Sequence, residues 1–302
     1  MIDITIFAAI GFLFAAYAVV GNDALQTLGT FIASNSRIHW FWLFLFAAVI
    51  LVLTFTYGWV VNDGDPSYGR LANAKKYPAV EVQWYHTLPP LVLLIITRFG
   101  VPVSTSFMVL TVFASIGGLS SMLQKSLIGY GLAFACGLGV FLIASVTLEK
   151  FFRKTEHQQH HPIWVLLQWV TTAYLWSVWL IQDFANIFVF LPRELSAMEG
   201  FTALLAIVAL LAYTFSNSGG PVQRVLRSKT AVTDIRSATI IDFMFASLLF
   251  YFKELNHIPM STTFVFLGLI AGREYGFALT QKAVSFFQTS KSVLSDISKA
   301  YI

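Results

Sequence analysis

Long apolar runs dominate this sequence and constrain its fold more than any other feature. Several of them approach the roughly 20 residues that a helix needs to cross the hydrocarbon core of a bilayer. Because lipid offers the backbone no hydrogen-bond partners, a chain of such runs must cross as helices. The sequence therefore predicts an all-α, polytopic transmembrane helical bundle, with apolar helices expected within residues 2–20, 40–61, 86–99, 128–148, 162–181, 201–216 and 235–252.

The low charge content supports this class of protein. Only 11% of the 302 residues are charged and 57% are hydrophobic, whereas about a quarter of the residues in a soluble domain are charged. This balance excludes a disordered chain, a nucleic-acid-binding module and a soluble enzyme with a polar surface. We expect an integral protein of the cell (inner) membrane, with the lipid bilayer as a partner and no nucleic acid partner.

The two ends of the chain and one loop give weaker signals. Residues 2–20 lack the basic start and the cleavage pattern of a signal peptide, so we expect a retained membrane helix. The basic composition of residues 217–234 predicts a cytoplasmic loop. The tail, 276–302, keeps apolar residues at helical spacing between lysines, which predicts an amphipathic helix on the membrane surface or against the bundle.

Two pairs of unusual segments recur in the same order along the chain. Between the acidic and the hydroxyl-rich member of a pair, 81 residues separate Asp23 from Ser104 and 78 separate Asp183 from Ser261. Near-equal spacing indicates a duplicated unit, and polar interruptions at matching places in two halves are typical of transporter binding sites. The segments are GNDALQTLGT (21–30) with PVSTS (102–106), and QDFANIFVFL (182–191) with PMSTT (259–263).

The duplication predicts the organisation of the chain. We expect a first transmembrane repeat in residues 1–150 and a second in residues 151–275, followed by the tail, all within one membrane domain. Residues 102–119 and 259–275 each open with proline and hydroxyl groups, and they are too short or too polar at one end for plain spans. We predict re-entrant half-helices there.

The acidic segments contain two matched triplets of an amide, an acid and a second amide. On a helix, positions i and i+3 share a face, so the acid and the distal amide converge. A carboxylate at membrane depth is costly and normally faces a cavity or a partner. Carboxylate and carboxamide oxygens suit Na⁺, whereas protonation of the acids and structural hydrogen bonds between helices are the alternatives. The triplets are Asn22, Asp23 and Gln26, and Gln182, Asp183 and Asn186.

The hydroxyl-rich segments indicate an anion site. Proline begins a helix well, and the N–H groups of the first turn have no partner within the helix. A helix start also carries partial positive charge. Two such starts that face each other could hold a tetrahedral oxyanion without arginine, although a simple N-cap explains each one alone. The residues concerned are Ser104, Thr105 and Ser106, and Ser261, Thr262 and Thr263.

Together these motifs resemble those of the inorganic phosphate transporter family, the sodium- or proton-coupled phosphate and sulfate permeases. GNDALQTLGT resembles the G-A-N-D-x-x-N-x-x-G-T signature, QDFAN resembles N-D-x-A-N, and PVSTS and PMSTT resemble the P-x-S-T-T-H elements. The resemblance implies an inverted-repeat bundle with broken helices, a homodimer, Na⁺ at the acidic motifs and an oxyanion at the hydroxyl elements. Carried over, the ion-site positions are Asn22, Asp23, Asp183 and Asn186, and the substrate-site positions are Ser104, Thr105, Ser261, Thr262 and Thr263.

The chain departs from the family pattern at several motif positions. Gln26 and Gln182 replace asparagines, and Ser106 replaces a threonine. Phe107 and Phe264 stand where the family elements end in histidine. These departures leave the anion open between phosphate and a sulfate-like oxyanion, and the coupling ion open between Na⁺ and H⁺.

We therefore predict a secondary active transporter that moves an inorganic oxyanion together with Na⁺ or H⁺. It is not expected to be an enzyme, because no nucleophile–base pair or metal constellation stands out. One alternative is a proton-coupled or channel-like anion permease in which Asp242 titrates. The other is a non-transporting membrane subunit with the same fold.

Two further groups keep open roles at this stage. Asp242 lies deep in the span 235–252, where it suits either proton coupling or pairing with a basic group. His157, His160 and His161 include an i, i+4 pair that could bind a metal, but a polar loop with incidental imidazoles explains them better.

Overall fold

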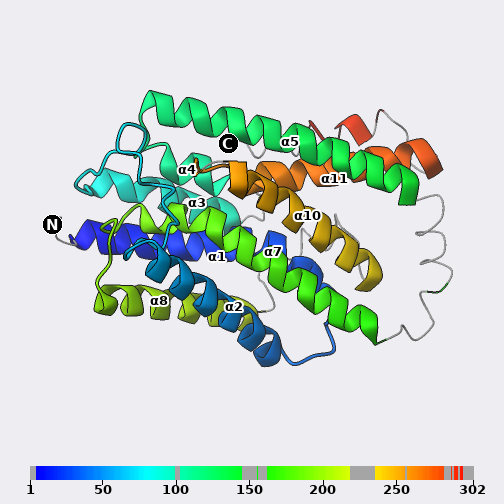
Figure 1. The fold of residues 1–302 in the computed structure, drawn as a ribbon, viewed down its shortest axis with the longest axis horizontal. Helices are drawn as coiled ribbons and strands as arrows, with labels where there is room; N and C mark the ends of the chain where they lie inside the picture. Colours follow the sequence, from blue (N-terminus) through cyan, green and yellow to red (C-terminus); the bar gives the residue numbers. More distant parts are fainter. Residues whose placement is uncertain are drawn as a thin grey trace.

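The structure, a computed structural model, is an all-helical bundle in its described part. It describes residues 5–98, 103–144, 155, 162–217, 235–255 and 257–281, and positions 287, 289–291, 293 and 294 of the tail. Within these residues no strand occurs, as the sequence predicts. The long helices run side by side along the longest dimension of the molecule (Figure 1). The helices are α1 (Ile6–Ser34), α2 (Trp40–Val61), η1 (Trp84–Thr87), α3 (Leu88–Arg98), α4 (Thr105–Leu110), α5 (Ile116–Ala144), α7 (Ile163–Phe188), α8 (Ala197–Ser216), α10 (Ile235–Leu255) and α11 (Thr262–Gln281).

Five of these helices are long and apolar enough to cross a membrane, namely α2, α5, α7, α8 and α10. Helix α1 becomes a sixth if its two parts, Ile6–Asn22 and Gln26–Ser34, form one span with a bend of 46°. This bend lies across the first acidic motif, where a broken helix is expected. The chain is thus built as an integral membrane protein, and which membrane holds it stays a prediction.

The predicted boundaries differ from the observed helices most clearly at α1, α5, α7 and α11. Helix α1 continues to Ser34, fourteen residues past the predicted end at 20. Helix α5 begins at Ile116, twelve residues before the predicted 128, because Ser115 caps it and accepts a hydrogen bond from the N–H of Gly118 at 3.2 Å. The polar residues of its first turns hide this start from a search for apolar runs. Helix α7 runs unbroken through the second acidic motif, and α11 extends over 20 residues, longer than a half-helix.

Glycines let α5 and α11 approach closely, side by side at the edge of the bundle (Figure 1). A Cβ at Gly272 would lie 2.3 Å from the carbonyl oxygen of Phe134, and one at Gly268 would lie 2.4 Å from that of Tyr130. On the facing helix, a Cβ at Gly137 would lie 2.6 Å from the carbonyl oxygen of Leu269. Small residues that permit backbone contact are typical of helix pairs in membranes. This contact fixes α11, and with it the second hydroxyl element at its start.

Helix α7 occupies the middle of the bundle, where it contacts α1, α2 and α10. The rings of Trp176 and Trp179 stack at a centroid distance of 5.0 Å and are fully buried. The indole N–H of Trp176 donates to the carbonyl oxygen of Ala47 on α2 at 2.9 Å. These contacts hold the end of α7, which carries the second acidic motif, inside the protein.

Several predictions fall on residues that the structure does not describe. They concern the histidine cluster (His157, His160 and His161), the basic loop 217–234 beyond its first residue, and most of the tail 276–302. The side chain of Asp23 also lies outside the described part, although its backbone belongs to the bent helix α1.

The close approach of α5 and α11 leads to a stability prediction. Gly272→Ala should lower the free energy of unfolding by about 1–3 kcal/mol, because the new methyl group meets backbone atoms that cannot move aside. Gly131→Ala on α5 is the matched control, since its Cβ has no atom within 4 Å. Thermal unfolding in detergent measures both variants. Equal midpoints for Gly272→Ala and the wild type would contradict the proposed contact.

Candidate functional site

The two hydroxyl elements meet inside the bundle. Ser104 caps α4, and its Oγ accepts from the N–H of Phe107 at 3.3 Å. Ser261 does the same before α11, where its Oγ accepts from the N–H of Phe264 at 3.3 Å. The Ser104 hydroxyl donates to the Ser261 hydroxyl at 2.6 Å. Equivalent residues of the two motifs therefore touch directly.

Each acidic motif reaches the hydroxyl element of the other half. The side-chain amide of Gln26 donates to Thr263 Oγ1 at 3.5 Å, and that of Asn186 donates to Ser106 Oγ at 3.1 Å. Gln26 and Asn186 hold the same place in their motifs, as do Thr263 and Ser106. The four segments thus form one cluster with a reciprocal pattern of contacts.

Further hydrogen bonds join each acidic motif to its own half. The side-chain amide of Asn22 donates to the carbonyl oxygen of Val103 at 2.8 Å. The carboxylate of Asp183 accepts from Thr262 Oγ1 at 2.9 Å and from the amide of Asn186 at 2.8 Å. All six hydroxyl residues and the described side chains of the acidic motifs are buried: Asn22, Gln26, Ser104, Thr105, Ser106, Gln182, Asp183, Asn186, Ser261, Thr262 and Thr263.

The second acidic motif contains oxygen atoms with unused hydrogen-bonding capacity. Gln182 Oε1 and Asn186 Oδ1 are buried and accept no hydrogen bond from the described residues. The amide nitrogen of Gln182, in contrast, donates to the carbonyl oxygen of Leu249 at 3.2 Å. Leaving a buried acceptor unpaired is costly. These two amide oxygens and the Asp183 carboxylate are oxygen ligands of the type that a hard cation such as Na⁺ prefers.

One part of the sequence argument for an anion site needs correction. Helix α4 has only six residues, so its macrodipole adds little to the partial positive charge at Ser104. Helix α11 is long enough to contribute. At the first hydroxyl element, the hydroxyl groups are therefore the main hydrogen-bond donors that could face an anion.

Two buried cations beside the cluster were missed by the sequence analysis. Arg70 is 2% exposed and Lys125 is 6% exposed. Arg70 Nε donates to the carbonyl oxygen of Ile181 at 2.7 Å. Arg70 Nη1 and Lys125 Nζ both donate to the carbonyl oxygen of Ile258, at 3.5 Å and 2.8 Å. These carbonyl groups directly precede the second acidic motif and PMSTT, respectively, so both cations lie beside the second half of the cluster.

The charge on Arg70 acts on Asp183. Burial lowers the pKa of the Arg70 guanidinium to about 10, and the nearby Asp183 carboxylate opposes this shift. Arg70 therefore stays positively charged at neutral pH. Lys125 had a signal in the sequence, since it is a lone charge within an apolar helix. Arg70 had none, because it belongs to a polar loop with balanced charges.

Asp242 lies in a separate polar cluster. Its Oδ1 accepts from the hydroxyl of Thr30 at 2.6 Å, and its Oδ2 accepts from the hydroxyl of Thr172 at 2.8 Å. Within the described residues it pairs with no basic group, so the sequence alternative of an ion pair is not observed there.

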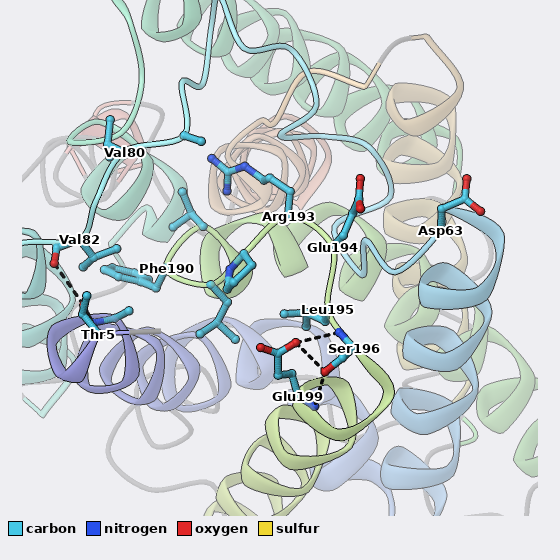
Figure 2. A pocket seen from close by; sticks show the side chains of 15 residues that line it. Thr5, Asp63, Val80, Val82, Phe190, Arg193, Glu194, Leu195, Ser196 and Glu199 are labelled. Atoms are coloured by element: carbon cyan, nitrogen blue, oxygen red, sulfur yellow. Dashed lines mark hydrogen bonds between the residues drawn. The ribbon is translucent and has the colours of Figure 1, made fainter. Parts of the chain in front are cut away.

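Two cavities lie near these elements. One, of about 600 Å³, is lined by Val103, Ser104 and Phe107 together with apolar residues of α3 and α5, so it reaches the first hydroxyl element. The other, of about 530 Å³, lies at the N-terminal end of α8, and none of the predicted site residues lines it. Figure 2 shows Arg193 in this second cavity, extending toward Val80 and away from Asp63.

Comparison with known proteins gives one structural neighbour and no relative in sequence. No protein-family model matches the chain, and no curated protein matches it. A solved structure described as "The sodium-dependent phosphate transporter" superimposes with a TM-score of 0.58 at 17% identity, covering 96% of this chain and 93% of that one. At this level of identity the likeness concerns the fold. The fold of this chain is therefore similar to that of a sodium-dependent phosphate transporter.

Proposed function

We propose that this protein is a secondary active transporter of an inorganic oxyanion, coupled to Na⁺ or H⁺. The observation that carries the proposal is the meeting of the four motif segments, centred on the 2.6 Å hydrogen bond between Ser104 and Ser261. The similarity in fold to a phosphate transporter supports phosphate ahead of sulfate as the anion. Reconstituted uptake of labelled phosphate and sulfate, with and without a sodium gradient, tests the proposal.

The hydroxyl groups suit an oxyanion because each can donate or accept a hydrogen bond. An anion between the two elements would replace the Ser104–Ser261 hydrogen bond with bonds to its own oxygens. The two phenylalanines that stand in place of family histidines, Phe107 and Phe264, pack edge to face at 5.5 Å. The site is thus apolar there, and neither hydroxyl element supplies the imidazole that ends the family motif.

The acidic motifs explain why transport would require a cation. An anion and a carboxylate repel strongly in a medium of low dielectric constant. Arg70 offsets part of the charge at the second motif, and Na⁺ held by the acidic motifs would offset the rest, so anion binding should strengthen when the cation is bound. The proposed ion ligands are Asn22, Asp23, Gln26, Gln182, Asp183 and Asn186.

The reciprocal contacts also support two inverted repeats, residues 1–150 and 151–275, that meet at the shared cluster. A homodimer remains part of the proposal through the family resemblance. A non-transporting subunit is the competing function, and failure of reconstituted protein to move any of several labelled anions would favour it.

The first functional prediction concerns Asp183. Asp183→Asn should reduce cation-dependent uptake by at least about tenfold, because it removes the carboxylate that binds the ion, a loss of roughly 1.4 kcal/mol or more. Uptake by proteoliposomes over a sodium titration measures this, with Glu81→Gln as a control at an exposed carboxylate. Wild-type uptake by a well-folded Asp183→Asn variant would refute the site.

The second concerns the paired hydroxyls. The double variant Ser104→Ala, Ser261→Ala should raise the KM for the anion about thirtyfold, since each of the two lost hydrogen bonds contributes on the order of 1 kcal/mol. Ser104→Thr with Ser261→Thr keeps the hydroxyls and should retain a near-normal KM. Ser247→Ala removes a hydroxyl that bonds only to its own helix. An unchanged KM in the double alanine variant would remove these residues from the anion site.

The third functional prediction concerns Arg70. Here the substitution is expected to strengthen Na⁺ binding instead of weakening it. Removing its charge should strengthen Na⁺ binding beside Asp183, so Arg70→Gln should lower the Na⁺ concentration for half-maximal uptake about threefold or more. Arg70→Lys keeps the charge and should leave that concentration near the wild-type value. General damage to the fold would reduce uptake without this shift, and a higher Na⁺ requirement would contradict the assignment.

A further inference from the structure

Among the side chains that the structure describes, Asp242 is a second deeply buried carboxylate besides Asp183. It is 1% exposed and lies on α10, where α1 and α7 pack against that helix (Figure 1). Each of its oxygens accepts one hydrogen bond, from Thr30 on α1 at 2.6 Å and from Thr172 on α7 at 2.8 Å. Both partners are neutral hydroxyl groups.

The charged and titratable groups of the surrounding helices, as far as the structure describes them, make other contacts. Asp183 bonds to Thr262 and Asn186, Lys125 donates to Ile258, and Arg236 donates to Thr155. None of the described titratable groups on α10 or on the helices packed against it bonds to Asp242: Tyr17 on α1, Tyr174 and Asp183 on α7, Lys125, Tyr130 and Cys136 on α5, Arg273, Glu274 and Tyr275 on α11, and Arg236 and Tyr251 on α10.

A carboxylate buried in this way needs compensation. An isolated ionised acid in an apolar interior is very costly, and it is normally neutralised by a proton or by a cation. Within the described residues, no group of three or more acidic, histidine or cysteine side chains is placed to hold a metal ion, so a metal ion at Asp242 would depend on neutral oxygen ligands, as Na⁺ would at the acidic motifs. A proton requires only one carboxylate oxygen.

The surrounding hydroxyls suit both protonation states. With Asp242 ionised, Thr30 and Thr172 donate to it. Thr172 also accepts from the amide of Gln168 at 3.3 Å, and Gln168 accepts from the amide of Asn35 at 2.8 Å. With Asp242 protonated, its O–H can donate to Thr30, because a hydroxyl oxygen also accepts. The two states differ by rotation of hydroxyl groups, without movement of a helix.

Asp242 also has no counterpart in the first half of the chain. Helix α3 precedes the first hydroxyl element as α10 precedes the second, and it contains no acidic residue. The carboxylate is therefore not a requirement of the repeated scaffold.

We propose that Asp242, held by Thr30 and Thr172, is a proton-binding site separate from the acidic motifs, and that its proton is carried in the transport cycle. The second half of this statement rests on the proposed function. The proton site itself does not, and it is tested first.

Infrared difference spectroscopy of the purified protein in lipid vesicles tests the site through the C=O stretch of a protonated carboxylic acid. We expect an acid band that disappears as the pH rises, that is absent from Asp242→Asn and that is retained in Glu81→Gln. Thr172→Val removes a donor to the ionised form, so its acid band should persist to higher pH. If Asp242→Asn does not fold, the shifted titration of Thr172→Val tests the site in its place.

Two spectroscopic outcomes would overturn the proposal. One is the absence of any Asp242-dependent acid band across the titration. The other is an acid band that vanishes when Na⁺ is added at constant pH, which would make the cluster a sodium site instead.

Transport assays then test the use of the proton. Proteoliposomes with a pH gradient report net uptake of labelled phosphate, and exchange of internal for external phosphate reports the step that needs no proton release. Asp242→Asn should lower the ratio of proton-driven uptake to exchange, whereas an equal loss of both would refute a role in coupling. Wild-type protein that moves no anion would refute the proposed function, while the infrared titration would still decide the proton site.

Discussion

The hydrogen bond between Ser104 and Ser261 joins segments that lie 157 residues apart in the chain. Both hydroxyls also cap helices, so the same two side chains end the connecting segments, start α4 and α11, and tie the halves together. The remaining motif contacts, from Gln26 to Thr263 and from Asn186 to Ser106, lie around this pair. Because these groups are buried in an apolar bundle, each must find its partner inside the protein. The polar cluster is therefore the point about which the helices are arranged.

Buried charge is the second constraint. Asp183 lies near the guanidinium of Arg70, and Lys125 binds the same carbonyl oxygen as Arg70. Asp242 has two hydroxyl partners and, in the described part of the chain, no cation. The two carboxylates are thus compensated in different ways, one by fixed positive charge and the other by neutral donors. Such differences between acids in one bundle are a physical basis for assigning different ions to them.

Much of the architecture follows from sequence patterns. Apolar runs identified the helical class, and the spacing of i and i+3 residues placed Asp183 beside Asn186, where they hydrogen-bond at 2.8 Å. The repeated motifs indicated which segments should be compared, and the structure brings them together. Their roles in binding stay proposals.

Other features depend on tertiary contacts that no local pattern contains. Arg70 belongs to a polar loop, but its side chain lies inside the protein. There it donates hydrogen bonds to two backbone carbonyl groups and lies near the Asp183 carboxylate. The early start of α5 follows from the cap at Ser115, within residues too polar to count as a span. The length of α11 reflects backbone contact through glycine, which an analysis of hydropathy does not detect.

The glycine contact between α5 and α11 also limits how the helices could move in a transporter of the proposed kind. Close backbone contact through these glycines opposes sliding, so we expect α5 and α11 to move together as a single rigid beam. One of them belongs to each predicted repeat. If the protein alternates between outward-open and inward-open states, α5 and α11 would move as one body. Lys125 on α5 and the second hydroxyl element at the start of α11 would move with them. In the proposed transport cycle a hinge would then lie elsewhere, and the bend of 46° in α1 makes that helix a candidate for it.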